Sequence, residues 1–335
     1  MTDTGRANRE YLMAWREYAH DSPLYRELIA ITADSPDLLE IIGRIHGQPP
    51  PNLFLAAIQY LLMKDPAVPL AAYYESMVTR AKPVSGVAAP FREYVLDHQD
   101  RIVEIANSRY TQTNECRRCV ALLPGVMASP FDQFHLIDLG TSAGLNLAMD
   151  EYHYDFGGVV WGPPSSVELA CEVRGDSPRL RDIRILSRIG IDLNVVDVSD
   201  QDQRMWLDAL IWPEHAERRA RLRTAIEVAA TIDVDLVEGD VLDVLAGVLD
   251  DVPAYDPVVI VNSFVLNQFS PDERNALADV INAARVSRRI FRVSLESIHI
   301  GDPLPHLEIG EGRDLMQLGT AHHHGDWIDL QYDQS

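Results

Sequence analysis

Apolar residues recur with the spacing of α-helices along the first third of the chain. Residues 53–63 form an apolar run, and between residues 91 and 106 apolar side chains return every three or four positions, which predicts an amphipathic helix. A further helix is predicted over residues 113–123, ending before Pro124. The sequence therefore predicts an α-helical domain over residues 1–128.

The pattern changes to strands that alternate with helices over residues 129–335. Residues 134–139 are mostly apolar and are followed by Gly140, which is typical of a buried parallel strand. Similar short apolar runs are separated by helix-like segments, and they predict strands at 189–193, 234–237, 258–261 and 290–295. This alternation predicts a doubly wound α/β sheet.

One segment of this second region has a period of two instead. Tyr152, Tyr154 and Phe156 alternate with polar residues, and a second alternating stretch covers residues 167–173. Glycine and proline residues separate the two stretches. This pattern predicts a β-hairpin inserted into the domain at about residues 151–175.

The net charge narrows the range of partners. The chain has 29 lysines and arginines against 51 aspartates and glutamates, a formal net charge of −22. Such a charge repels phosphate backbones and anionic lipid surfaces, so we expect no nucleic-acid and no membrane partner. Three cysteines are too few for a disulfide framework. We therefore expect a soluble cytoplasmic protein that acts on a small molecule.

The first candidate site is the glycine-containing turn after the first predicted strand. Gly140 and Gly144 lie between Asp138 and a predicted helix, so the backbone can approach a ligand closely there. No lysine follows Gly144, which excludes a Walker loop. Ser142 stands where a dinucleotide-binding fingerprint has its middle glycine.

Polar residues also follow the next three predicted core strands. Asp192, Asp240 and Asn262 each come at the end of such a strand, where open α/β sheets bind ligands. Asp192 is suited to accept hydrogen bonds from a ribose diol, and Asp240 from an exocyclic amine. Each acid taken alone has an alternative role in a turn or as a helix N-cap.

This series of residues resembles the S-adenosylmethionine site of class I methyltransferases, which usually have glycine at the position of Ser142. Nearly the whole chain also resembles a bacterial family catalogued as domain of unknown function 2332. The resemblance implies a Rossmann-like, class I methyltransferase-type sheet with an inserted hairpin, preceded by a helical domain. The matching stretches include Ser22-Pro23-Leu24-Tyr25, Gln112-Thr113-Asn114-Glu115, Ser142-Ala143-Gly144-Leu145-Asn146, Trp212-Pro213-Glu214 and Ser294-Leu295-Glu296.

The resemblance implies S-adenosylmethionine as cofactor and a small-molecule methyl acceptor, and we expect no metal. The residues implied in cofactor binding are Asp138, Gly140, Ser142, Gly144, Asp192, Leu193, Asp240 and Val241. Asn262 and Tyr154 are the candidates for positioning the acceptor, and its pocket is expected to include Asn114, Glu115, Arg118 and Tyr152. The alternatives are that the two tyrosines simply pack and that the Asn114 cluster is a surface cap.

Two other functions remain open from the sequence. One is a methyltransferase-like protein that binds S-adenosylmethionine, or no ligand, without turnover. The other is a serine hydrolase, because residues 140–144 also fit a nucleophile elbow. Ser142 would then be the nucleophile, Asp256 the acid, and the histidine one of His299, His306, His322, His323 or His324.

Two further motifs have simpler interpretations. Cys116 and Cys119 form a C-x-x-C pair inside a helical run, and we expect two packed thiols because no second pair supplies zinc ligands. The histidines at 322–324 lie between predicted strands and are expected in a solvated loop.

Overall fold

The computed structural model describes residues 3–298 and 303–332. The chain forms two compact units, one of residues 1–113 with 200–220 and the other of residues 114–199 with 221–335. We call them the helical unit and the C-terminal unit. They differ from the ranges predicted from the sequence in two places, since 114–128 belongs with the C-terminal unit and 200–220 with the helical unit.

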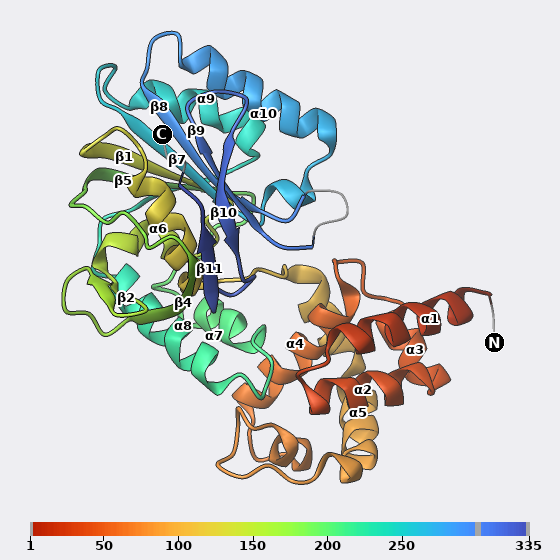
Figure 1. Ribbon diagram of the computed structural model, residues 1–335. Helices are drawn as coiled ribbons and strands as arrows, with labels where there is room; N and C mark the ends of the chain where they lie inside the picture. The colour runs from red at the N-terminus through yellow and green to blue at the C-terminus, as the bar shows by residue number, and fades with distance from the viewer. Residues whose placement is uncertain (1–2, 299–302, 333–335) are drawn as a thin grey trace. The chain divides into compact units, whose positions relative to one another are not determined.

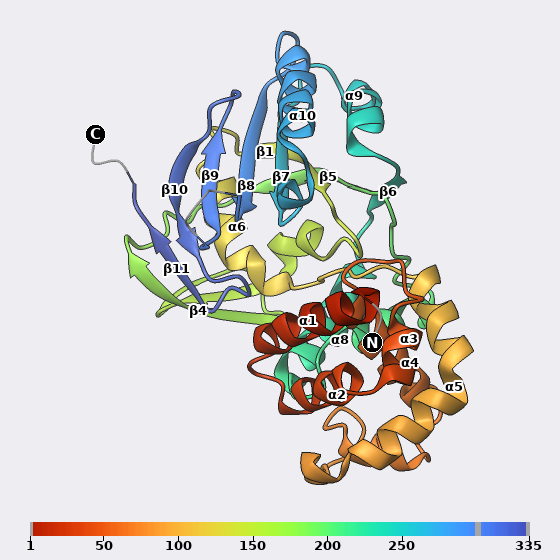
Figure 2. The same ribbon diagram turned by 90° about the vertical axis from the view of Figure 1, so that its right-hand side faces the viewer.

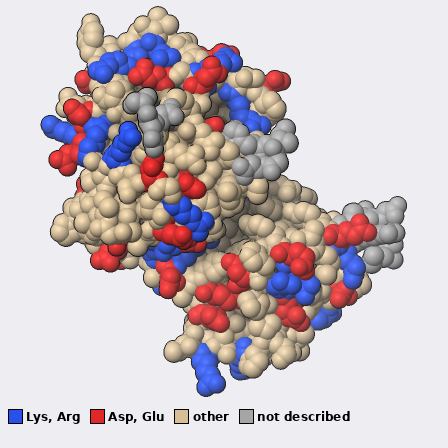
Figure 3. All heavy atoms as spheres, viewed as in Figure 1, with Lys and Arg blue, Asp and Glu red and all other residues tan. Residues whose placement is uncertain are grey.

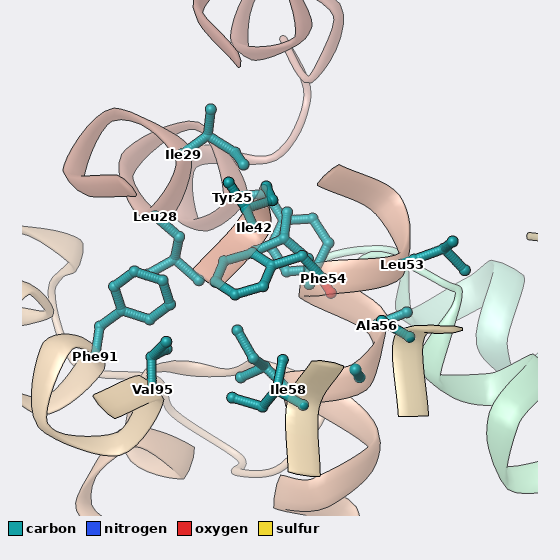
Figure 4. Packing of buried hydrophobic residues seen from close by; sticks show 14 of the residues in the cluster. Tyr25, Leu28, Ile29, Ile42, Leu53, Phe54, Ala56, Ile58, Phe91 and Val95 are labelled. Atoms are coloured by element: carbon teal, nitrogen blue, oxygen red, sulfur yellow. The ribbon is translucent and has the colours of Figure 1, made fainter. Parts of the chain in front are cut away.

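The helical unit is built around α4, a helix with buried residues on most sides. Figure 4 shows its core, where the rings of Phe54 and Phe91 meet edge to face with centroids 6.3 Å apart. The predicted helices over 53–63 and 91–106 correspond to α4 and α5. The helices wholly within this unit are α1 (Asp3–Tyr18), α2 (Pro23–Ala33), α3 (Pro36–Ile42), α4 (Pro50–Lys64), η1 (Pro69–Tyr73), η2 (Val84–Gly86), α5 (Ala88–Ser108) and α7 (Gln201–Ala209).

The C-terminal unit contains an 11-stranded mixed sheet, with the order β3-β2-β4-β11-β10-β9-β8-β7-β1-β5-β6. The five strands β6-β5-β1-β7-β8 are parallel, and β8, β9, β10 and β11 continue as an antiparallel meander. The strands are β1 (Gln133–Leu139), β2 (His153–Phe156), β3 (Val159–Trp161), β4 (Glu168–Gly175), β5 (Arg184–Asp192), β6 (Asp235–Glu238), β7 (Val258–Ser263), β8 (Ile290–Glu296), β9 (His306–Gly310), β10 (Met316–Ala321) and β11 (Trp327–Leu330).

Helices cover both faces of the parallel strands (Figures 1 and 2). On one face, α9 (Val241–Asp251) and α10 (Pro271–Ala284) pack on a cluster that includes Ile260 and Ile290. On the other face, α6 (Cys119–Met127) lies so close that a Cβ at Gly125 would be 2.5 Å from Val293. Residues 290 and 293 point to opposite faces of β8 because side chains alternate along a strand.

The third predicted helix, over residues 113–123, is wrong in its bounds. The chain stays extended until η3 (Cys116–Arg118), and α6 then continues through Pro124 to Met127. The side chains of Asn114 and Glu115 bond to segments distant in sequence, and these bonds hold residues 114–115 outside the helix.

The inserted hairpin is shorter than predicted. β2 pairs antiparallel with β3, and the tight turn between them contains Gly157 and Gly158, both with positive φ. The second alternating stretch, β4, instead runs parallel to β2 and also parallel to β11. The sequence pattern gave the two alternating stretches but not the direction of their pairing, because both directions have the same period.

Candidate functional site

Residues 140–144, which we call the glycine turn, follow β1 in an unusual backbone conformation. Gly140, Ser142 and Gly144 have φ angles of 71°, 50° and 72°. Glycine adopts such angles without steric cost, whereas serine does not. A Cβ at Gly140 would also lie 2.1 Å from Cγ2 of Val265, so the turn requires glycine there for two reasons.

All five amide groups of the glycine turn have a protein acceptor. Three donate to backbone oxygens: Gly140 (2.8 Å) and Thr141 (3.2 Å) to Ile191, and Gly144 (2.9 Å) to Thr141. The other two donate to side chains, Ser142 to Oδ2 of Asp192 (2.8 Å) and Ala143 to Oδ1 of Asn114 (3.2 Å). The turn therefore does not present the free amides with which helix N-termini and nests bind phosphate.

Asp138 lies fully buried at the end of β1. Its Oδ2 accepts hydrogen bonds from Oγ1 of Thr141 (3.0 Å) and from Nδ2 of Asn146 (3.3 Å). Its Oδ1 is buried and has no hydrogen-bond partner among the described residues. Burial raises the pKa of Asp138 to about 7. An unsatisfied carboxyl oxygen here favours a ligand that brings a donor or a positive charge.

Asp192 ends β5, the strand next to β1, and also supports the turn. Its Oδ2 accepts the Ser142 amide and its Oδ1 accepts the Asn194 amide at 2.9 Å. A carboxylate has about four acceptor positions, so two remain for a ligand. Burial raises the pKa of Asp192. The neighbouring Leu193 side chain is 64% exposed and gives an apolar surface beside the carboxylate.

Asp240 and Val241 lie where α9 begins, just beyond β6. Asp240 is the N-cap of α9 and accepts the Leu242 amide at 2.9 Å through Oδ1. The cap role, which was the alternative for a single acid, is thus present. Asp240 is exposed, so solvent or a ligand can reach the rest of its carboxylate, and Val241 is buried beneath it.

Asn262 ends β7 and belongs to a buried network around Glu296. Its Nδ2 donates to Oε1 of Glu296 (2.8 Å) and to Oγ of Ser294 (2.9 Å). Glu296 also accepts the backbone amides of Val265 (2.8 Å) and Asn267 (3.3 Å), and burial raises its pKa. The network fixes the loop after β7, whose Val265 packs on Gly140.

The residue Glu296 was not predicted as part of a site. The sequence signal for it was its place in the family-like stretch Ser294-Leu295-Glu296, since an isolated glutamate at the end of a strand indicates nothing. Phe264, in the loop that Glu296 holds, has a φ of 58° and is a second residue that the sequence did not reveal.

Tyr152 and Tyr154 are packed in the interior of the C-terminal unit. Both rings are fully buried, and their hydroxyl groups donate to the carbonyls of Leu145 and Met149 at 2.7 Å. These contacts favour the alternative, in which both tyrosines pack in the core, over a role in positioning or enclosing an acceptor. Both hydroxyls are already bonded to carbonyls of η4 (Leu145–Glu151).

The cluster after residue 112 is engaged within the C-terminal unit. Asn114 bonds the glycine turn through Nδ2 to Oγ of Ser142 at 3.0 Å. Glu115 is buried and pairs with Arg221, whose Nε lies 3.1 Å from Oε1. The Arg118 guanidinium lies 4.1 Å from the Phe264 ring centroid. These contacts make Asn114 and Glu115 supports of the site rather than parts of a free acceptor pocket.

A cavity of about 260 Å³ lies beside the glycine turn. Most of its lining residues are apolar, and Asp197, Ser199 and Asp233 are polar. It is lined by Ala143, Gly144, Asp197, Val198, Ser199, Ala229, Ala230, Ile232, Asp233, Val234 and Leu236.

The arrangement expected of a serine hydrolase is not found in the described residues. The partner of Oγ of Ser142 is Asn114, and no described histidine bonds to it. Asp256 instead lies 3.3 Å from His135, which is near the amino end of β1 and so at the opposite edge of the sheet. His299 lies outside the described residues.

The remaining motifs do not form a redox or metal centre in the described part of the chain. Cys116 and Cys119 are free and buried, as expected for packed thiols, and burial raises the pKa of both. Among the described residues, no three His, Cys, Asp or Glu side chains are grouped so that they would hold a metal ion. Within the same residues, no helix has the length and apolar character to cross a membrane.

Comparison with known proteins places the chain beside one bacterial family. The model of a family described as "Uncharacterized protein conserved in bacteria (DUF2332)" matches residues 9–330 of the chain. A search of curated proteins gave no match.

Proposed function

The chain belongs to the bacterial DUF2332 family, and we propose that its C-terminal unit binds S-adenosylmethionine and transfers the methyl group to a small molecule. The observation that carries the proposal is the buried, unpartnered Oδ1 of Asp138 beside a glycine turn whose amides are all engaged. Such a site favours a cationic ligand over an anionic one.

The sheet topology supports the same location. The chain order of the parallel strands reverses between β1 and β7, and doubly wound sheets bind ligands outside the carboxyl ends of the strands at such a point. Asp138 lies near the end of β1, before the glycine turn, and Asn262 lies near the end of β7, on either side of this switch point. This arrangement is consistent with the methyltransferase-type fold.

The residues present fit a nucleoside with an attached amino acid. Asp138 would accept hydrogen bonds from the ammonium group through its free Oδ1, and Asp192 would hold the ribose hydroxyls through its two remaining acceptor positions. Leu193 would pack on the base, and Asp240 would accept from its amino group. S-adenosylmethionine, when bound, supplies a methyl group already activated by the adjacent sulfonium.

The task of the protein is then to align the acceptor and exclude water. Asn262 is suited to hold an acceptor near β7 because Glu296 and Ser294 fix its amide in place. The same network holds the loop that packs on Gly140, and so keeps the methyl-transfer region rigid.

Binding without turnover is the second candidate function. It is favoured by the hydrogen bonds that already engage Asn262 and both tyrosines, the residues expected to position an acceptor. Formation of S-adenosylhomocysteine by purified protein mixed with a fractionated small-molecule extract distinguishes the two functions.

The test of binding is calorimetry with S-adenosylmethionine and S-adenosylhomocysteine. We expect saturable binding at one site, and Asp192→Ala should weaken it by about 1–3 kcal/mol, because polar groups lose their partner. The matched control is Asp235→Ala, which removes an exposed carboxylate at the amino end of β6. Because Asp192 also supports the turn, the free energy of unfolding is measured for both variants.

The proposal would be overturned if neither S-adenosylmethionine nor S-adenosylhomocysteine bound at millimolar concentration. If the Asp192 and Asp235 variants lost the same amount of binding affinity, the assignment of the ribose contact to Asp192 would be overturned, although the protein would still bind the ligand.

A further inference from the structure

The chain passes between its two units at three places. These are residues 113/114, 199/200 and 220/221. Inside the C-terminal unit, the segments next to these places begin with Asn114, end with Ser199 and begin with Arg221.

Ser142, at the centre of the glycine turn, is bonded to two of these segments. Its carbonyl accepts the amide of Val196 at 3.0 Å, in the segment that leads to Ser199. Its hydroxyl accepts from Asn114 at 3.0 Å. The amide of Asn194, two residues before Val196, bonds to Asp192, which also holds the Ser142 amide.

The third segment is tied to the first. Arg221 pairs with Glu115, the residue after Asn114, through Nε and Oε1 at 3.1 Å. The Glu115 side chain is only 2% exposed and the Arg221 side chain 18% exposed, so solvent screens this ion pair less than a surface pair.

We propose that Ser142 couples ligand binding at the glycine turn to the segments through which the chain enters and leaves the C-terminal unit. The inference rests on the proposed function for the identity of the ligand. A ligand that binds one conformation of the turn more tightly than another increases the population of that conformation. The segments that are bonded to the turn change with it. A ligand that requires the turn as observed therefore orders residues 114–118 and 194–199.

The serine itself is part of the argument. At a φ of 50°, glycine would adopt the backbone conformation more easily than serine. A glycine, however, has no hydroxyl group for Asn114. The serine accepts a less favourable backbone conformation and provides the bond to the entry segment.

Hydrogen exchange of the full chain with and without saturating S-adenosylhomocysteine tests the coupling. We expect the ligand to slow exchange by about fivefold or more in residues 140–146 and also in 114–118 and 194–199. In Ser142→Gly, measured at saturating ligand, the slowing in 114–118 should become smaller, because Asn114 then keeps only its bond from the Ala143 amide. Asn275→Ala, in the exposed part of α10, is the control and should behave as the unaltered chain.

The outcomes separate the coupling from the proposed function. Binding that slows exchange only in residues 140–146 would overturn the coupling and leave the proposed function intact. Equal slowing of 114–118 in Ser142→Gly would also overturn it.

If S-adenosylhomocysteine does not bind, the proposed function fails. The coupling between the segments that contact Ser142 is then measured in the protein without ligand. Asn114→Ala should then speed exchange of the Val196 amide by about fivefold, although Asn114 does not contact that amide. An unchanged Val196 amide would overturn the coupling.

Discussion

Asp138 combines three properties at the scale of a single residue: full burial, a pKa raised to about 7, and one oxygen without a partner. Its ordinary pKa is 3.8. The folded protein therefore holds a proton on this carboxyl over a range in which the unfolded chain has lost it.

The pKa of Asp138 gives a prediction for stability. Because the folded pKa is raised, the contribution of this group to stability is fully present below the unfolded value and is lost as the pH rises through about 7. Asp138→Asn removes this dependence, so the variant should gain stability relative to the original chain as the pH rises from about 4 to about 7. Urea unfolding at a series of pH values measures it, and parallel curves for the two proteins would contradict the assigned pKa.

The same residue gives a prediction for binding. A cationic ligand prefers the ionised carboxylate, so the affinity for S-adenosylmethionine should fall as the pH decreases below about 7, approaching tenfold per pH unit. Calorimetry on the original chain and on Asp138→Asn measures this change. A pH dependence that persists in the asparagine variant would assign it to another group.

The sequence reveals the acids at the ends of the strands but not their hydrogen-bond partners. Asp138, Asp192 and Asp240 were recognisable because each follows an apolar strand, which is a local signal. Glu296 and the bonds of Asn114 depend on residues more than twenty-five positions away, and no local pattern encodes such a pairing.

At the scale of the elements, the glycine turn depends on close packing as well as on backbone angles. Gly140 and Gly157 have similar φ angles, 71° and 65°, but only Gly140 faces a neighbour, since a Cβ at Gly157 meets nothing within 4 Å. The pair therefore separates the backbone cost of an added methyl group from its steric cost.

Alanine at these two positions should have different effects. Gly157→Ala should lower the free energy of unfolding by about 1 kcal/mol, the cost of the left-handed conformation alone. Gly140→Ala should lower it by at least about 2–3 kcal/mol, because the new methyl group also displaces Val265. Denaturant unfolding of both variants measures the difference, and equal losses would contradict the packing of Val265 on the turn.

The loop after β7 depends on Glu296 in a similar way. Glu296→Ala leaves the amides of Val265 and Asn267 without their acceptor and removes one of the two acceptors of the Asn262 side chain, which should cost about 3 kcal/mol of stability. Glu296→Gln keeps one acceptor oxygen and should cost less. Glu308→Gln, on the neighbouring strand β9, is the control for loss of a charge. A smaller loss in alanine than in glutamine would contradict the network.

Elements were predictable where the pattern of apolar residues decides them. The core strands β1, β6, β7 and β8 lie close to their predicted positions because each is a short apolar run, whereas β5 begins at Arg184, five residues before its predicted start. The parallel pairing of β4 with β2 was missed, because alternation reports which face is buried and not which strand lies alongside.

At the scale of the whole molecule, the sequence predicted a helical part and an α/β part but not how the chain is divided between them. Residues 200–220 interrupt the C-terminal unit and pack with the helical unit, as the hydrogen bonds from Gln59 to the carbonyls of Ala209 and Ile211 show. Side chains that join segments so distant in the sequence leave no periodic signal.

The net charge of −22 and the engaged amides of the turn together predict that phosphate-bearing ligands do not bind at the turn. On the face shown in Figure 3, acidic and basic side chains are interspersed. ATP and NAD carry phosphates that need free amides or cations, so neither should displace bound S-adenosylhomocysteine at a tenfold excess, about 1.4 kcal/mol of advantage. Competition calorimetry measures this, and displacement by either nucleotide would indicate a phosphate site instead.

A crystal structure of the full chain grown with S-adenosylhomocysteine tests the central claim most directly. The account predicts density for the ligand at the glycine turn, with its ribose hydroxyls on Asp192 and its ammonium group on Oδ1 of Asp138. Density confined to the cavity lined by Val234 and Leu236, with Asp138 still unpartnered, would contradict it.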